Sequence, residues 1–377
     1  MTRALLLTVM LLRACVPTAE AQSGPWTPHV LSHPYRGADG IDLYDVDGDG
    51  HQDLAVAWEA GRQLTVTRGG QPWHPLGAGT IAIDWAGGSR AYEDVRIDDW
   101  DGDQLPDYAG AAEGTGLGVH VFLSSLGYAY TRAKNSINHH WQTVTSCDIT
   151  GNGQPDLLAA GAGVLWWWQA RNASAGAWSQ RQIATPGRAL YIGCDDIDAD
   201  GDLDVLWTDR LGSGLTWAEN EPGGTWPQTV IAGGGASNIA CAGDVDSDGD
   251  TDYVVPREDG TLAWYERGAA WLGHPIAVPW LTGSTTIAKG CAVADVDADG
   301  APDLLVTLWD PDPLVTPGRV RLLRTWQAWE TIDATVLKTD EPVVVDANGD
   351  GLLDVCVTDE GVSNSGPGGG LICLAAP

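Results

Sequence analysis

The chain consists of short apolar runs separated by turns rich in Gly and Asp, and the same order of runs recurs along its length. One apolar run, such as 239–242, comes before an acidic turn and a second run follows that turn. A third run containing Trp comes after a Gly turn, as in 262–265, and a fourth accompanies a further Trp, as in 224–231. Runs of this length between such turns predict antiparallel strands, and no stretch has the 3.6-residue period of a helix.

The acidic turn recurs seven times with a fixed internal spacing. Oxygen-bearing side chains occupy positions 1, 3 and 5, Gly usually occupies position 6, and Asp at position 9 begins an apolar run. The seven sets are Asp45, Asp47, Asp49 and Asp53; Asp99, Asp101, Asp103 and Asp107; Asp148, Thr150, Asn152 and Asp156; Asp196, Asp198, Asp200 and Asp204; Asp244, Asp246, Asp248 and Asp252; Asp295, Asp297, Asp299 and Asp303; and Asp346, Asn348, Asp350 and Asp354.

Successive copies begin 48 to 54 residues apart. A repeat of this length with four short strands is typical of a propeller blade. We therefore predict an all-β fold, a seven-bladed β-propeller of four-stranded antiparallel blades. The last copy has room for three strands only, whereas residues 26–32 look like the fourth strand of the other copies. This segment is predicted to complete the seventh blade and close the ring, which leaves no open sheet edge.

The spacing of the acidic turns suits Ca²⁺, which takes six to eight oxygen ligands. Carboxylates at positions 1, 3 and 5 of a tight loop converge on one point, a backbone carbonyl at position 7 adds to them, and the acid at position 9 completes the shell. An EF-hand is rejected because it needs Glu at position 12 and a following helix. Position 12 is instead apolar, as in Val56 and Trp207, and a strand follows. Up to seven Ca²⁺ ions are expected.

Charge and side-chain substitutions refine this expectation. The net charge is −31, which argues against a nucleic-acid or anionic-membrane partner. The turn positions named above hold 25 of the 51 acidic residues. The third turn has two carboxylates, with Thr150 and Asn152 in place of acids, and is expected to bind most weakly. The alternative is that some turns, the third above all, hold no ion.

The N-terminus and the cysteines indicate export. Residues 1–21 resemble a secretory signal peptide, so residues 22–377 are expected to form the mature propeller domain; a lipoprotein signal at Cys15 is the alternative. No later segment is apolar for long enough to span a membrane. Six cysteines remain, and disulfides Cys356–Cys373, Cys147–Cys194 and Cys241–Cys291 are expected, with free buried thiols as the alternative.

The 19 Trp residues could either pack between blades or stack on sugar rings. Recurrence at matching places favours packing for Trp166, Trp217, Trp264, Trp178, Trp226 and Trp271. Trp58, Trp85, Trp100 and Trp309 occupy less regular places and are the candidates for an exposed surface. No nucleophile elbow, His-Glu-x-x-His pattern or phosphate-binding loop is present, so no catalytic residue is assigned.

The seven Asp-rich turns resemble those of the FG-GAP/VCBS repeat family, which includes the propeller of integrin α-subunits and some propeller lectins. The resemblance covers nearly the whole chain after residue 21. It implies that each turn joins the first two strands of a blade and binds Ca²⁺. The Phe-Gly and Gly-Ala-Pro signatures of integrins are missing, so integrin partners are not carried over.

We expect a secreted, calcium-binding, non-catalytic module for binding or adhesion, whose partner is an extracellular protein or a glycan. The ligand is expected on a face with variable loops, among them 84–94, 124–141 and 309–319. A propeller lectin is the second hypothesis, and an extracellular enzyme with its site at the central channel is the third.

Overall fold

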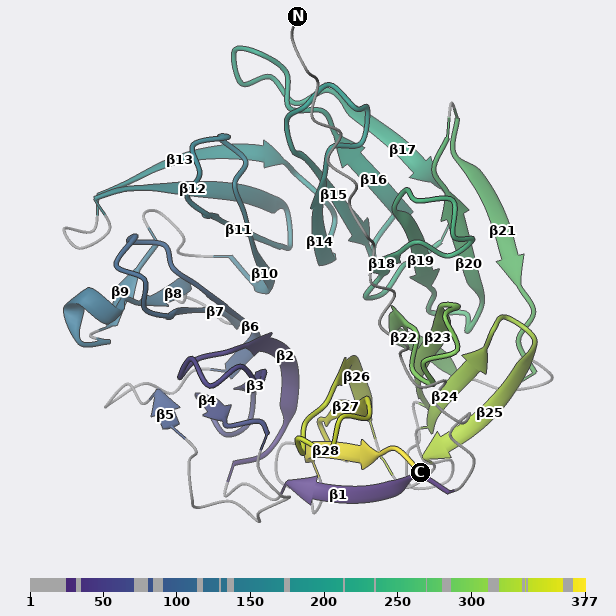
Figure 1. The fold of residues 1–377 in the computed structure, drawn as a ribbon. Helices are drawn as coiled ribbons and strands as arrows, with labels where there is room; N and C mark the ends of the chain where they lie inside the picture. The colour runs from purple at the N-terminus through teal and green to yellow at the C-terminus, as the bar shows by residue number, and fades with distance from the viewer. Residues whose placement is uncertain are drawn as a thin grey trace, which may run out of the picture.

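The computed structural model forms a ring of seven four-stranded antiparallel sheets, as Figure 1 shows. It describes residues 25–31, 35–70, 81–83, 91–113, 118–128, 130–133, 139–172, 177–212, 214–233, 235–268, 270–279, 286–310, 319–333, 336, 338–361 and 369–377. The predicted signal peptide lies outside these residues, as do Trp85 and most of the predicted variable loops at 84–94 and 309–319.

In blades 1 to 6 the four strands form a meander that follows chain order from the centre of the ring outward, and in blade 7 the first three do (Figure 1). Blade 1 is β2 (Ala38–Tyr44), β3 (Asp53–Trp58), β4 (Gln63–Thr67) and β5 (Ile81–Ile83); blade 2 is β6 (Ala91–Asp98), β7 (Asp107–Glu113), β8 (Val119–Phe122) and β9 (Tyr130–Arg132); blade 3 is β10 (Trp141–Cys147), β11 (Asp156–Gly161), β12 (Val164–Asn172) and β13 (Ala177–Ala184); blade 4 is β14 (Ala189–Asp195), β15 (Asp204–Asp209), β16 (Gly214–Ala218) and β17 (Gln228–Ala232).

The remaining blades have the same plan. Blade 5 is β18 (Cys241–Gly243), β19 (Asp252–Pro256), β20 (Leu262–Glu266) and β21 (Leu272–Ile276); blade 6 is β22 (Ile287–Ala294), β23 (Asp303–Trp309), β24 (Arg319–Arg324) and β25 (Ala328–Asp333); blade 7 is β26 (Thr339–Val345), β27 (Asp354–Asp359), β28 (Gly370–Ala375) and β1 (Thr27–Leu31). One short 3₁₀ turn, η1 (Ser124–Leu126), follows β8 and is the only helical element of the described residues.

Blade 7 confirms the predicted closure. β1 pairs antiparallel with β28, from Thr27 opposite Ala375 to Leu31 opposite Leu371. The outermost strand of the last blade therefore comes from the N-terminal end of the propeller, and Figure 1 shows β1 lying alongside β28. Since β1 covers what would be an exposed edge of β28, the closure both completes the ring and protects that edge.

The hydrophobic core is divided into seven layers, one between each pair of neighbouring blades. The layer between blades 7 and 1, for example, joins Leu31, Ile41 and Trp58 to Val345 and Leu371. The second strand of a blade faces such a layer on both sides, which is why every residue of β3, β11, β15 and β27 is buried. Burial on both sides explains the continuous apolar runs after the acidic turns.

All three predicted disulfides are present. Cys356 and Cys373 lie opposite each other on β27 and β28. Cys147–Cys194 links the inner strands of blades 3 and 4, and Cys241–Cys291 links those of blades 5 and 6. Disulfides persist in oxidising compartments, so the three bonds indicate an extracellular protein.

Candidate metal sites and the channel cluster

All seven acidic turns join the first strand of a blade to the second, at one end of the ring's inner strands. We call them acidic loops 1 to 7; they comprise residues 45–53, 99–107, 148–156, 196–204, 244–252, 295–303 and 346–354. Every predicted ligand residue lies in one of these loops. The structure therefore places the residues on the strand connections that the sequence predicted, and it does so in every blade.

The backbone of each loop turns through two left-handed residues, at positions 4 and 6. At position 6 six loops have Gly, and Gln104 of acidic loop 2 adopts the same conformation with φ of 67°. At position 4 the left-handed residue is Gly in four loops but Ala199, Ser247 and Ala298 in the others. Residues with a Cβ are rarely left-handed, so these three positions show that the loop shape is imposed by its other contacts.

Those contacts centre on the Asp at position 9, which is at most 1% exposed in all seven loops. In acidic loop 5 the Oδ2 of Asp252 accepts the backbone N–H of Val245 at 3.0 Å, and Oδ1 accepts that of Arg267 at 3.0 Å. Val245 belongs to the loop itself, whereas Arg267 follows the third strand of the blade. The position 9 carboxylate thus fastens the loop to the neighbouring hairpin.

The same pair of bonds recurs in every blade except blade 3. There, Oδ2 of Asp156 accepts the N–H of Thr150, while its buried Oδ1 has no hydrogen-bond partner among the described residues. Burial raises the pKa of Asp107 to about 7 and those of Asp156 and Asp252 to about 6, because an ionised carboxylate loses hydration there.

Carboxylates at positions 1 and 3 converge with a third acid of the same loop, at position 9 or at position 5. In acidic loop 1, Oδ atoms of Asp45 accept the N–H groups of Gly48 and Gly50, at 2.8 and 2.9 Å. Carboxylate oxygens of Asp45, Asp47 and Asp53 lie within 4.8 Å of one another. The equivalent group forms in acidic loop 2 (Asp99, Asp101, Asp107), whereas in acidic loop 4 the third member is at position 5 (Asp196, Asp198, Asp200). Several converging carboxylates around one point suit a hard cation such as Ca²⁺.

Side chains from outside the loops contact some of the predicted ligands but not others, which makes the seven candidate metal sites unequal. The loop sequences did not predict this difference. Arg324 forms an ion pair of 2.7 Å with Asp297 at position 3 of acidic loop 6. Arg68 pairs with Asp47 of acidic loop 1 at 3.1 Å. In acidic loop 3 the hydroxyl of Thr150 accepts a hydrogen bond from the Gln169 amide, at 2.9 Å. A cation entering these loops has to compete with these partners.

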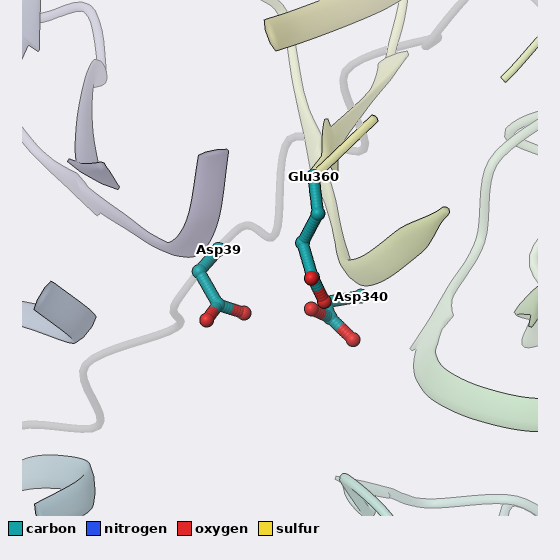
Figure 2. A group of neighbouring side chains, drawn as sticks. All are labelled: Asp39, Asp340 and Glu360. Carbon is teal, nitrogen blue, oxygen red and sulfur yellow. The ribbon is translucent and has the colours of Figure 1, made fainter. Parts of the chain in front are cut away.

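A second acidic cluster, which the sequence analysis missed, lies at the opposite end of the inner strands. Figure 2 shows Asp39, near the start of β2, facing Asp340 of β26 and Glu360, which follows β27. Carboxylate oxygens of these three lie within 4.8 Å of one another, and those of Glu59, Glu93 and Glu113 form a similar group. We call the two groups the channel cluster. The sequence signal for this cluster was weak: an acidic residue occurs near the start of some innermost strands and directly after the second strand of some blades.

Five of the six residues of the channel cluster, all except Asp340, line a cavity of about 210 Å³ that is also lined by Arg96, Arg188, Arg210, Lys289 and Lys338. Burial, followed by the charge of Asp340, raises the pKa of Glu360 to about 9. Burial also disfavours the ionised form of Asp340, but the adjacent Lys289 outweighs it and holds the pKa of Asp340 below its usual value.

Tryptophan burial corrects one prediction. Trp58 and Trp100, expected on the surface, are 1% and 2% exposed and belong to inter-blade layers. Trp58 also donates its indole N–H to the hydroxyl of Thr65 at 2.8 Å. Trp58 is the last residue of β3 and Trp100 is the second residue of acidic loop 2. Both pack against a neighbouring blade, which periodicity within one repeat does not reveal. The six recurrent Trp residues pack against inter-blade layers as predicted.

A groove of about 680 Å³ lies between blades 3 and 4 on the side of the acidic loops. Trp167 and Trp226 supply its aromatic surface, and Gln180, Arg181 and Asp202 are among its polar residues. The indole N–H groups of both Trp residues, Oε1 of Gln180 and Oδ1 of Asp202 are buried without a hydrogen-bond partner in the described part of the chain. Exposed Arg181 and Glu221 also line the groove, so it offers a donor and an acceptor.

Among the described residues, no helix has the length and apolar character needed to cross a membrane. A search of curated protein sequences found no significant match.

Solved structures share the fold at low sequence identity. One is the complex of BBS1N with ARL6DN, with a TM-score of 0.58 and 13% identity over 93% of this chain and 97% of that chain. Another is the extracellular domain of the hybrid two-component system BT4673 of B. thetaiotaomicron, with a TM-score of 0.58 and 10% identity over 93% of this chain and 39% of that one. The V. cholerae biofilm matrix protein Bap1 gives a weaker match, with a TM-score of 0.44 and 12% identity over 89% of this chain and 76% of that one, which is not counted as a shared fold.

A sequence model of the FG-GAP-like repeat matches residues 148–207, 196–255 and 244–306. Each match begins at position 1 of an acidic loop and extends through the second strand of the next blade, so the matched unit is the one seen in the structure. The four other acidic loops repeat the same geometry. The chain thus contains FG-GAP-like repeats within a seven-bladed β-propeller.

Proposed function

We propose that this chain is a secreted propeller that binds Ca²⁺ in its acidic loops and acts as a non-catalytic binding or adhesion module. The observation that carries the proposal is the convergence of carboxylates in loops that are held in shape by the buried Asp at position 9. Carboxylates gathered at this distance repel one another when no cation is present, by about 4 kcal/mol for a pair 4 Å apart at an effective dielectric of 20. Bound Ca²⁺ removes that repulsion and stabilises the folded ring by mass action.

Calorimetric titration of the calcium-free protein tests the metal sites. We expect several Ca²⁺ ions to bind and the unfolding temperature to fall when a chelator is added. An Asp259→Asn variant is the control, since Asp259 is an exposed acid in a turn outside the acidic loops. Absence of heat on titration together with an unchanged unfolding temperature would rule the metal sites out.

N-terminal sequencing of the exported protein tests the proposed removal of the signal peptide by cleavage after residue 21.

A lectin is the second candidate function, and the groove between blades 3 and 4 is the observation that favours it. Sugars need aromatic faces together with hydrogen-bond donors and acceptors, and the groove combines these. It is bordered by the turn at 219–227 between β16 and β17, which is longer than the corresponding turn at 267–271 of blade 5. Thr150 of acidic loop 3 contributes a neutral hydroxyl to its wall.

A glycan array tests this second function, with Trp226→Ala as the groove variant. Trp271→Ala is the matched control, since Trp271 occupies the same place in blade 5, outside the groove. We expect glycan binding that is lost in Trp226→Ala and retained in Trp271→Ala. No binding to any glycan, or equal loss of binding in both variants, would contradict the lectin function of the groove. A protein would then be the favoured partner of the adhesion module.

A further inference from the structure

The channel cluster lies far from the acidic loops. Asp39 is the second residue of β2, and acidic loop 1 begins immediately after the last residue of that strand. The rise of a strand places the two ends of β2 about 20 Å apart. Asp340 and acidic loop 7 stand in the same relation at the two ends of β26. Anything bound by Asp39 and Asp340 is therefore separate from the loop sites.

The side chain of Asp340 points to a missing ligand. It is 1% exposed, and its Oδ1 forms an ion pair of 2.5 Å with Nζ of Lys289. Its Oδ2 is buried and accepts no N–H or hydroxyl donor among the described residues; the groups that face it are the carboxyls of Glu360 and Asp39. Figure 2 shows this carboxyl group directed toward the space that Glu360 and Asp39 also face. A buried carboxylate oxygen with no such donor is costly, and it is rare in native proteins unless an ion or water satisfies it.

The charge around that space is also unbalanced. Six carboxyl groups from blades 7, 1 and 2 form the channel cluster, and two ammonium groups lie against it: Lys289 pairs with Asp340, and Lys338 pairs with Glu360. The three arginines that line the cavity are engaged elsewhere. Arg96 pairs with Asp42 at 2.7 Å, Arg188 donates to Oε1 of Gln142, and Arg210 pairs with Glu258 at 2.7 Å. A divalent cation would offset part of the remaining negative charge.

We propose that Asp39, Asp340 and Glu360 bind a hard divalent cation, of the Ca²⁺ type, at the channel end opposite the acidic loops. The ion would take one oxygen from each carboxylate and would include Oδ2 of Asp340. Asp39 belongs to blade 1, and Asp340 and Glu360 belong to blade 7. The bound ion would therefore link the two blades between which the ring closes. Three protein ligands leave coordination positions directed into the cavity, where oxygen atoms of water or of a ligand complete the shell.

Crystals of the full-length mature protein grown with MnCl₂ test the proposal, because Mn²⁺ takes the same oxygen ligands and scatters anomalously. We expect an anomalous peak between Asp39, Asp340 and Glu360 in the unaltered protein. In an Asp39→Asn variant that peak should disappear, while peaks at the acidic loops persist. Equilibrium dialysis should find one fewer bound Mn²⁺ per chain in this variant than in the Asp259→Asn control.

The outcomes separate this site from the loop sites. Peaks at the acidic loops with none in the channel would overturn the proposal and leave the proposed function intact; the two lysines would then suffice to balance Asp340 and Glu360. A channel peak with empty loops would support the proposal and contradict the loop sites. If Asp39→Asn does not fold, Glu360→Gln provides the second variant, and the peak in the unaltered protein decides the question in either case.

Discussion

Two carboxylates of acidic loop 5 provide a direct test of how the loops work, because the structure assigns them different tasks. Asp252 at position 9 is fully buried and accepts two backbone N–H groups, from Val245 and Arg267. Asp246 at position 3 is exposed and accepts the N–H of Asp248 at 3.2 Å. We compare Asp252→Asn with Asp246→Asn, each in excess Ca²⁺ and in chelator.

The expected magnitudes follow from these contacts. Asn keeps one acceptor oxygen, so Asp252→Asn loses one of two hydrogen bonds to a charged group and turns an amide N–H toward a backbone N–H. A hydrogen bond to a charged group contributes about 1.5–3 kcal/mol, so we expect a loss of about 2–3 kcal/mol in chelator. In excess Ca²⁺ the loss should be larger, because position 9 is also a predicted Ca²⁺ ligand. Asp246→Asn keeps its single hydrogen bond and relieves repulsion, so in chelator its free energy of unfolding should change little or rise slightly.

Calcium should separate the two variants. At free Ca²⁺ 100 times its Kd, one site stabilises the fold by about 2.7 kcal/mol, which Asp246→Asn would forfeit. Urea unfolding followed by tryptophan fluorescence and by far-UV circular dichroism measures all four values. If Asp246→Asn has the same small effect with and without Ca²⁺, loop 5 binds no ion. If Asp252→Asn is neutral in chelator, the buried position 9 carboxylate does not fasten the loop.

Three further predictions follow from the same structure. Burial raises the folded-state pKa of Asp252 to about 6, so the calcium-free protein should lose stability as pH rises from about 4 to about 7, and chelation should lower the unfolding temperature more at neutral pH than near pH 5 in melting experiments. Replacing Thr150 and Asn152 together by Asp should strengthen Ca²⁺ binding at acidic loop 3, which calorimetry would detect as an additional or tighter site; unchanged binding would contradict the weak-loop interpretation. Deleting residues 26–31 should expose the edge of β28, lower the unfolding temperature and promote association visible by size-exclusion chromatography, whereas a monomer of unchanged stability would contradict the closure role of β1.

The repeat period and the loop pattern were sufficient to predict the blade number, the strand order and the closing strand. These features are local, or repeat locally, so each copy supports the others. The disulfides were predictable for the same reason: once the blades are aligned, Cys147 and Cys194 occupy adjacent inner strands, and Cys356 lies opposite Cys373. The left-handed conformation at position 4 was not predicted, because Ala199 and Ser247 give no signal for it.

What the sequence determined by itself is the repeating unit: strands from apolar runs, turns from Gly and Asp, and candidate ligands from the spacing of acids. Only the tertiary structure decided which side chains from different blades meet. Trp58 and Trp100 become buried because a neighbouring blade covers them. Asp39 meets Asp340 only because the ring closes, since about 300 residues of chain separate them. The local sequence pattern determines the strands and turns of each blade. Sites between blades depend on packing between repeats, which no single repeat encodes.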